Sequence, residues 1–103
     1  MKSMKELGNR IKNLRKDAGL SKPKASKLLG YKSNGTIDSI EQGKSSIPVD
    51  KIPQIAKLYN VPIDDFLEII KEFDPQTYNR YMRLKKCLWE EFSDKIKEMS
   101  VSI

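Results

Sequence analysis

Two short helices, each with its own start and stop signals, are predicted between Ser21 and Gly43. Ser21 is a favourable N-cap, and Pro23 falls in the first helical turn, where the missing N–H of proline costs nothing. Gly30 and Gly43 stand at the two predicted C-terminal ends, where a left-handed residue commonly closes a helix. We expect Ser33 to cap the second helix. This stretch therefore predicts two short helices joined by a tight turn.

The basic residues are concentrated in the part of the chain that contains this pair. Residues 1–44 contain eleven Lys or Arg and four Asp or Glu, which gives a charge of +7. Residues 45–103 contain nine and ten, which gives −1, and the whole 103-residue chain carries +6. A basic surface beside two short helices is expected where a protein neutralises nucleic-acid phosphates.

The residue inventory argues against catalysis and metal binding. The chain has no histidine for general-base or metal chemistry, and Cys87 is its only cysteine. It also lacks a Gly-rich phosphate loop of the GxxxxGKS type. We therefore expect no enzyme activity, no metal and no cofactor. Because a single cysteine forms no internal disulfide and neither a membrane span nor a signal peptide is evident, we expect a soluble cytoplasmic protein without membrane contact.

Apolar residues recur at helical spacing along the rest of the chain, and no strand is predicted. Ser3 and Glu6 form a capping box for a first helix that ends near residues 17–19. A fourth helix is expected over about residues 49–59. A fifth begins at Asp64, where negative charge suits the helix dipole. The sequence thus predicts an all-α fold.

Four linked segments resemble the phage-repressor type of helix-turn-helix, the Cro/CI or XRE family. They are LGNRIKNLRKDAGLS, LLGYKS, TIDSIEQGK and IAKLYNVPIDDFL, in order and with the right spacing over residues 7–67. The resemblance implies a five-helix lambda-repressor-like DNA-binding bundle over residues 1–73. Outside the part that it covers, apolar residues at helical spacing predict a C-terminal amphipathic helix over residues 74–103. The resemblance also implies a phage or bacterial transcriptional regulator, a repressor that binds a palindromic operator in double-stranded DNA as a homodimer.

The chain departs from the family pattern in and around the first helix of the pair. Lys22 stands where the family usually has glutamine, so a mobile point charge replaces an oriented amide. Ala25 and Ser26 replace the usual leucine and alanine, which predicts thinner packing. Tyr31 and Lys32 add one residue to the turn, which would shift the entry of the second helix into the groove.

The resemblance makes residues 33–42 the recognition helix, laid in the DNA major groove. Asn34 could pair with adenine, and Thr36 could touch a thymine methyl group. Asp38 could accept a hydrogen bond from a cytosine amine. Alternatively, because a carboxylate repels phosphate, it rejects wrong bases or lies outside the contact. The base-contacting positions, which face away from the apolar stripe, are Asn34, Gly35, Thr36, Asp38 and Ser39.

Phosphate contacts must come from around this helix, because residues 33–42 contain no Lys or Arg. The candidates are Lys22, Lys24, Lys27, Lys32, Ser33 and Lys44. The alternative is that this run of lysines is a solvated face. Lys5 and Lys12 lie off the apolar stripe of the first helix, so we expect them to be solvated.

One charged pair has a structural interpretation. The family often pairs an arginine of the first helix with a glutamate of the recognition helix. Arg15 and Glu41 stand at those positions, and we expect them to form an ion pair that holds the fold rather than a DNA contact.

The last helix is predicted to begin at Asp74 and Pro75 and to run to about residue 99. Three interpretations are open: it dimerises with a second copy, it folds back on its own bundle, or it docks to another protein, as in an antitoxin. We favour dimerisation, and keep an antitoxin-like interaction protein as the alternative function. The contact residues in the first or third case are Tyr78, Tyr81, Met82, Leu88, Trp89, Phe92 and Ile96.

Overall fold

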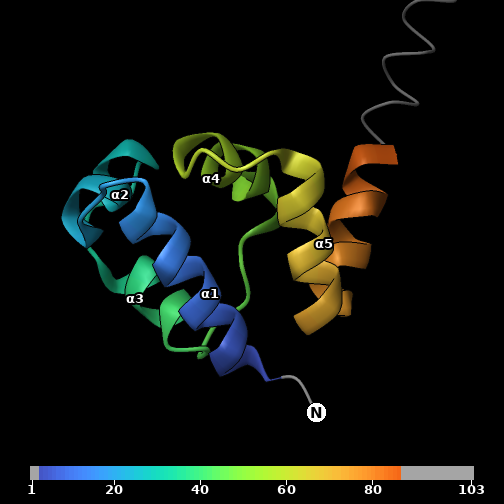
Figure 1. Ribbon diagram of the computed structural model, residues 1–103. Coiled ribbons are helices and arrows are strands. Elements are labelled where there is room, and N and C mark those ends of the chain that lie inside the picture. Colours follow the sequence, from blue (N-terminus) through green and yellow to red (C-terminus); the bar gives the residue numbers. More distant parts are fainter. Residues whose placement is uncertain (1–2, 87–103) are drawn as a thin grey trace, which may run out of the picture.

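The computed structural model describes residues 3–86, and these residues form helices without any strand (Figure 1). In chain order, the elements are α1 (Met4–Asp17), α2 (Lys22–Leu28), α3 (Gly35–Glu41), the 3-10 turn η1 (Val49–Lys51), α4 (Ile52–Leu58) and α5 (Ile63–Phe73), followed by a helix over residues 75–86. The predicted all-α fold is confirmed. Within this range, no helix combines the length and the apolar character needed to cross a membrane.

The first two helices begin at the predicted caps. The Ser3 hydroxyl accepts a hydrogen bond from the Glu6 N–H at 3.2 Å, and the Ser21 hydroxyl accepts one from the Lys24 N–H at 3.3 Å. Gly30 follows the end of α2 with a φ of +85°, a left-handed conformation that glycine adopts without strain. Local sequence signals therefore set the ends of both helices.

The start of α3 differs from the prediction. Ser33 does not occupy the N-cap position; Asn34 does, with φ −79° and ψ −3° and no hydrogen bond from its side chain to the helix. The Ser33 hydroxyl lies one residue earlier and only reaches the Gly35 N–H, at 3.5 Å. Because residue 34 already has helical angles, the serine cannot cap the first turn, and α3 begins without a side-chain cap.

The predicted helix over residues 49–59 is divided into η1 and α4. Residues 49–51 form a 3-10 turn, and the α-helix starts at Ile52. Pro53 consequently falls in the first turn of α4, where no hydrogen bond is lost. The next helix, α5, starts at Ile63, one residue before the predicted position.

The core is built from apolar residues of every helix. Its most buried large side chains include Leu7 of α1, Ile52 of α4, and Phe66 and Ile70 of α5. α1 packs on α3 and α5, α2 packs on α3, and α4 packs on α5. Figure 1 shows α1, α2 and α3 gathered at one end of the molecule, with α5 and the helix 75–86 at the other. The two short helices are thus held on one end of the bundle.

α1 and α3 approach each other backbone to backbone at Gly8. A Cβ atom at this position would overlap the carbonyl oxygens of Ile40 and Glu41. Only glycine therefore permits this crossing, which fixes the distance between the first helix and the C-terminal end of α3.

The helix 75–86 begins at a buried cap. The Asp74 carboxylate accepts hydrogen bonds from the Thr77 N–H at 3.3 Å and from the Thr77 hydroxyl at 2.5 Å. Both side chains are buried. Asp74 thus caps the helix at its predicted start, and it anchors this end of the helix against the bundle.

Tyr81 corrects one sequence-based expectation. It was expected at a dimer or partner contact, but it is only 9% exposed and belongs to the core of its own chain. Tyr78 also packs against this core, whereas Met82 is exposed. Up to residue 86 the helix therefore folds back on the bundle. An apolar periodicity does not distinguish burial within a chain from burial between chains. Four predicted contacts lie outside the described residues: Leu88, Trp89, Phe92 and Ile96.

Candidate nucleic-acid interface

The two sides of α3 have different exposure. Ile37 and Ile40 are buried in the core and fix the helix on the bundle. On the other side, the positions predicted to read bases remain accessible. Asn34 and Gly35 are exposed, and the other three positions are half-buried: Thr36, Asp38 and Ser39. The structure brings these residues together on one face of α3.

The Asp38 carboxylate on this face accepts two side-chain hydrogen bonds. Lys22, the first residue of α2, donates a hydrogen bond to it at 2.6 Å, and the Gln42 amide donates another at 2.9 Å. The hydrogen bond from Lys22 is the largest cause that lowers the pKa of Asp38 below its usual value. The carboxylate is therefore ionised at neutral pH with its charge balanced by a neighbouring cation.

This pair changes the role expected for Lys22, which was predicted as a phosphate contact. One of its three N–H groups is committed to Asp38, and the others remain for a phosphate. Sequence reasoning also missed Gln42, although its spacing of four residues from Asp38 on one helix face was a usable signal.

A second ion pair fixes α3 from the inside. Arg15 donates to both oxygens of the Glu41 carboxylate, at 2.9 and 3.0 Å, and to the carbonyl oxygen of Leu20 at 2.7 Å. The hydrogen bond with Glu41 raises the pKa of Arg15. Burial, with the nearby Glu41 charge, raises the pKa of Tyr59 to about 12. This cluster joins α1, α3 and the loop before α2.

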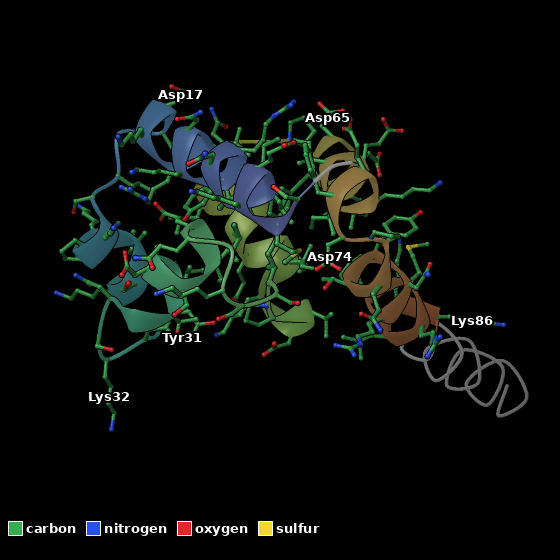
Figure 2. All side chains as sticks on the ribbon, turned by 90° about the horizontal axis from the view of Figure 1, so that it is seen from below. Asp17, Tyr31, Lys32, Asp65, Asp74 and Lys86 are labelled. Carbon is green, nitrogen blue, oxygen red and sulfur yellow. The ribbon has the colours of Figure 1, made fainter. Side chains whose placement is uncertain are left out.

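The turn between α2 and α3 carries two side chains that point in different directions, Tyr31 and Lys32 (Figure 2). Tyr31 is half-buried, with the Lys51 ammonium 5.7 Å from its ring centroid, a cation–π distance. Lys32 projects away from the bundle (Figure 2). The turn is thus tied to η1 by the tyrosine and carries an exposed cation at its tip.

The other predicted phosphate contacts surround α3 at the surface. Lys24 and Lys27 are exposed on α2, Lys32 and Ser33 are exposed in the turn, and Lys44 is exposed after α3. Between described residues, none of these lysines forms an ion pair. In the same range, no three His, Cys, Asp or Glu residues are grouped so that they could hold a metal ion.

Comparison with known proteins gives one family. A family model described as a helix-turn-helix domain matches residues 6–68, which is more than half of the chain. The match runs from α1 into α5 and includes both α2 and α3 with the two ion pairs. The search of curated proteins found no match.

Proposed function

The chain belongs to the helix-turn-helix domain family, and from this premise we propose that it is a sequence-specific transcriptional regulator that lays α3 in the DNA major groove. The observation that carries the proposal is the accessible face of α3. The carboxylate on this face, Asp38, is half-buried and neutralised by Lys22, and further lysines surround it. The protein acts by binding and not by catalysis.

Base reading falls to the N-terminal end of α3. The Asn34 side chain makes no cap hydrogen bond, so its amide is available to pair with adenine, and Thr36 can contact a thymine methyl group. Asp38, hydrogen-bonded by Lys22 and Gln42, presents a carboxylate that accepts a hydrogen bond from cytosine and rejects bases that offer another acceptor.

Phosphate contacts orient the helix in the groove. Lys24, Lys27, Lys32 and Lys44 are exposed around α3, and each phosphate that they neutralise releases counterions. Lys22 supplies a further contact through the N–H groups that Asp38 does not use. This charge favours any duplex, and the base-reading residues select among sequences.

We propose that the regulator is a repressor that binds a palindromic operator as a homodimer. A single module of this size buries little DNA surface, and a two-fold dimer doubles the contact. Met82, exposed on the helix 75–86, supports a contact from this end of the bundle, whereas Tyr81 is already used by the core.

The experiment is selection of binding sites from a random duplex pool. The affinity for the most enriched duplex is then measured across a salt series. We expect an enriched palindrome whose half-sites lie about one helical turn apart. An enriched site without symmetry would contradict the dimer. Binding that is sensitive to salt but enriches no sequence would contradict sequence-specific regulation and favour an antitoxin-like protein that binds a protein partner.

A further inference from the structure

A second group of polar and basic residues lines a cleft beside α3. Lys5, Asn9 and Lys12 follow one another on α1 at spacings of four and three, so they share one helix face. Across the cleft, which has a volume of about 440 Å³, lie residues of the C-terminal half of α3 and Lys44 just after it. As expected for a solvated position, Lys5 is exposed, and Lys12 is half-buried; both face α3 across this space.

The cleft has an unbalanced positive charge. Two carboxylates line it, and each already has a cation: Glu41 is paired with Arg15 at 2.9 Å, and Asp38 with Lys22 at 2.6 Å. Over residues 3–86, no ion pair involves the three remaining lysines of the lining, Lys5, Lys12 and Lys44. Together with the amides of Asn9 and Gln42, they offer several N–H donors and a net positive potential to an anion.

The walls of the cleft are fixed by close backbone contacts. Gly43 has a φ of +75°, and a Cβ on it would lie 2.7 Å from the Cα of Lys5. The Lys44 N–H donates to the carbonyl oxygen of Ser39 at 2.9 Å. The chain segments that carry Lys5 and Lys44 are therefore held against α3 before any ligand arrives, which reduces the entropy cost of binding.

We propose that this cleft binds backbone phosphate of the same duplex whose major groove receives α3. The inference rests on the proposed function. Asp38 belongs both to the accessible face of α3 and to the wall of the cleft, and Gln42, which is hydrogen-bonded to it, also lines the cleft. A duplex seated on that face therefore brings its backbone to the lysines. α1 then becomes a DNA-contacting element in addition to α2 and α3.

The test is a charge-removing pair of substitutions on α1, Lys5→Gln with Lys12→Gln. The slope of log binding constant against log salt should become shallower by about 1 to 2, because each phosphate contact contributes about 0.9. Specific and non-specific duplexes should lose affinity alike, and the sequences selected from a random pool should stay the same, since phosphate contacts carry no base information.

The matched control removes the same charge from the same helix outside the cleft. Arg10→Gln with Lys16→Gln alters two exposed residues that do not line it, and its slope should change by less than half as much. The inference is overturned if both double variants change the salt slope equally, or if Lys5→Gln with Lys12→Gln leaves it unchanged. The proposed function stands in either case. A wild-type chain that binds no duplex overturns both.

Phosphate in the cleft could also come from a free anion, and NMR of the amide resonances of Asn9 and Lys12 separates the two sources. The inference expects these resonances to shift with a DNA duplex and to respond little to inorganic phosphate at constant ionic strength. Saturable shifts with inorganic phosphate, and none with duplex, overturn it in favour of a free-anion site.

Discussion

The two ion pairs of α3 use the same kinds of charge in opposite surroundings. The side chains of Arg15 and Glu41 are 6% and 3% exposed and form two parallel hydrogen bonds, whereas those of Lys22 and Asp38 are 35% and 40% exposed. A buried pair must stay intact, because either partner alone would be an uncompensated charge in the core. An exposed pair exchanges with water and salt at little cost. The buried pair therefore positions α3. The exposed pair lets the side chains on the accessible face of α3 change their partners.

Breaking the buried pair should give the largest effect. Glu41→Ala leaves Arg15 buried without its carboxylate, which should lower the free energy of unfolding by about 3–5 kcal/mol in urea titrations followed by circular dichroism. The double variant Arg15→Met with Glu41→Leu should recover much of this loss, because apolar side chains replace both charges. A loss below about 1 kcal/mol in Glu41→Ala would contradict the structural role of the pair.

Shortening two side chains on the accessible face of α3 should weaken DNA binding and leave the fold intact. Asn34→Ala with Thr36→Ala should cost about 1–3 kcal/mol of specific DNA binding for each lost base contact, since neither side chain is in the core. Non-specific binding and the urea midpoint should stay close to wild type. Asn13→Ala, an exposed amide on α1, is the control. Unchanged specific affinity in the double variant would show that α3 is not the reading helix.

Ser26 carries a buried polar group that, unlike the Arg15–Glu41 pair, is not compensated by a partner within residues 3–86. The Ser26 hydroxyl is buried and, among the described residues, has no hydrogen-bond partner. Ser26→Ala should therefore stabilise the protein by about 1–2 kcal/mol in urea unfolding. Ser21→Ala, which removes the cap of α2, should destabilise it. If both serine variants shift stability in the same direction, the Ser26 hydroxyl has a partner after all.

The exposed pair should give the smallest change in stability. The pKa of Asp38 is lowered in the folded state, so this carboxylate stabilises the fold above its unfolded pKa and loses that contribution as pH falls through the folded value. Asp38→Asn should be slightly less stable than wild type at neutral pH, and the difference should vanish in acid. The variant should also bind non-specific DNA more tightly, because Lys22 is released for phosphate. Weaker non-specific binding would contradict this role for the pair.

What the sequence could predict was local. Ser3 and Ser21 cap helices whose first turns contain all the atoms involved, so the ends of α1 and α2 followed from neighbouring residues. Ser33 missed the cap position because residue 34 had already turned into the helix. Tyr81 was assigned to a partner because periodicity reports a buried face without saying what buries it.

The candidate site was predictable only in part for the same reason. The accessible end of α3 followed from its apolar stripe, but two features depend on how helices cross. Lys22 meets Asp38 across sixteen residues of chain, and Lys5 faces Lys44 across a cleft that exists only once α1 lies on α3. Contacts between residues far apart in the chain set the charge around the accessible face of α3. No local sequence pattern predicts such contacts.

Gly8 has a consequence for the nucleic acid as well as for the fold. The backbones of α1 and α3 touch there without intervening side chains. This close contact keeps α3 from tilting or sliding toward a groove of different width. A duplex that fits poorly must itself bend, twist or narrow, at an energy that depends on how stiff its base-pair steps are. The protein would then discriminate between operators at base pairs that no side chain touches, through the mechanics of the DNA.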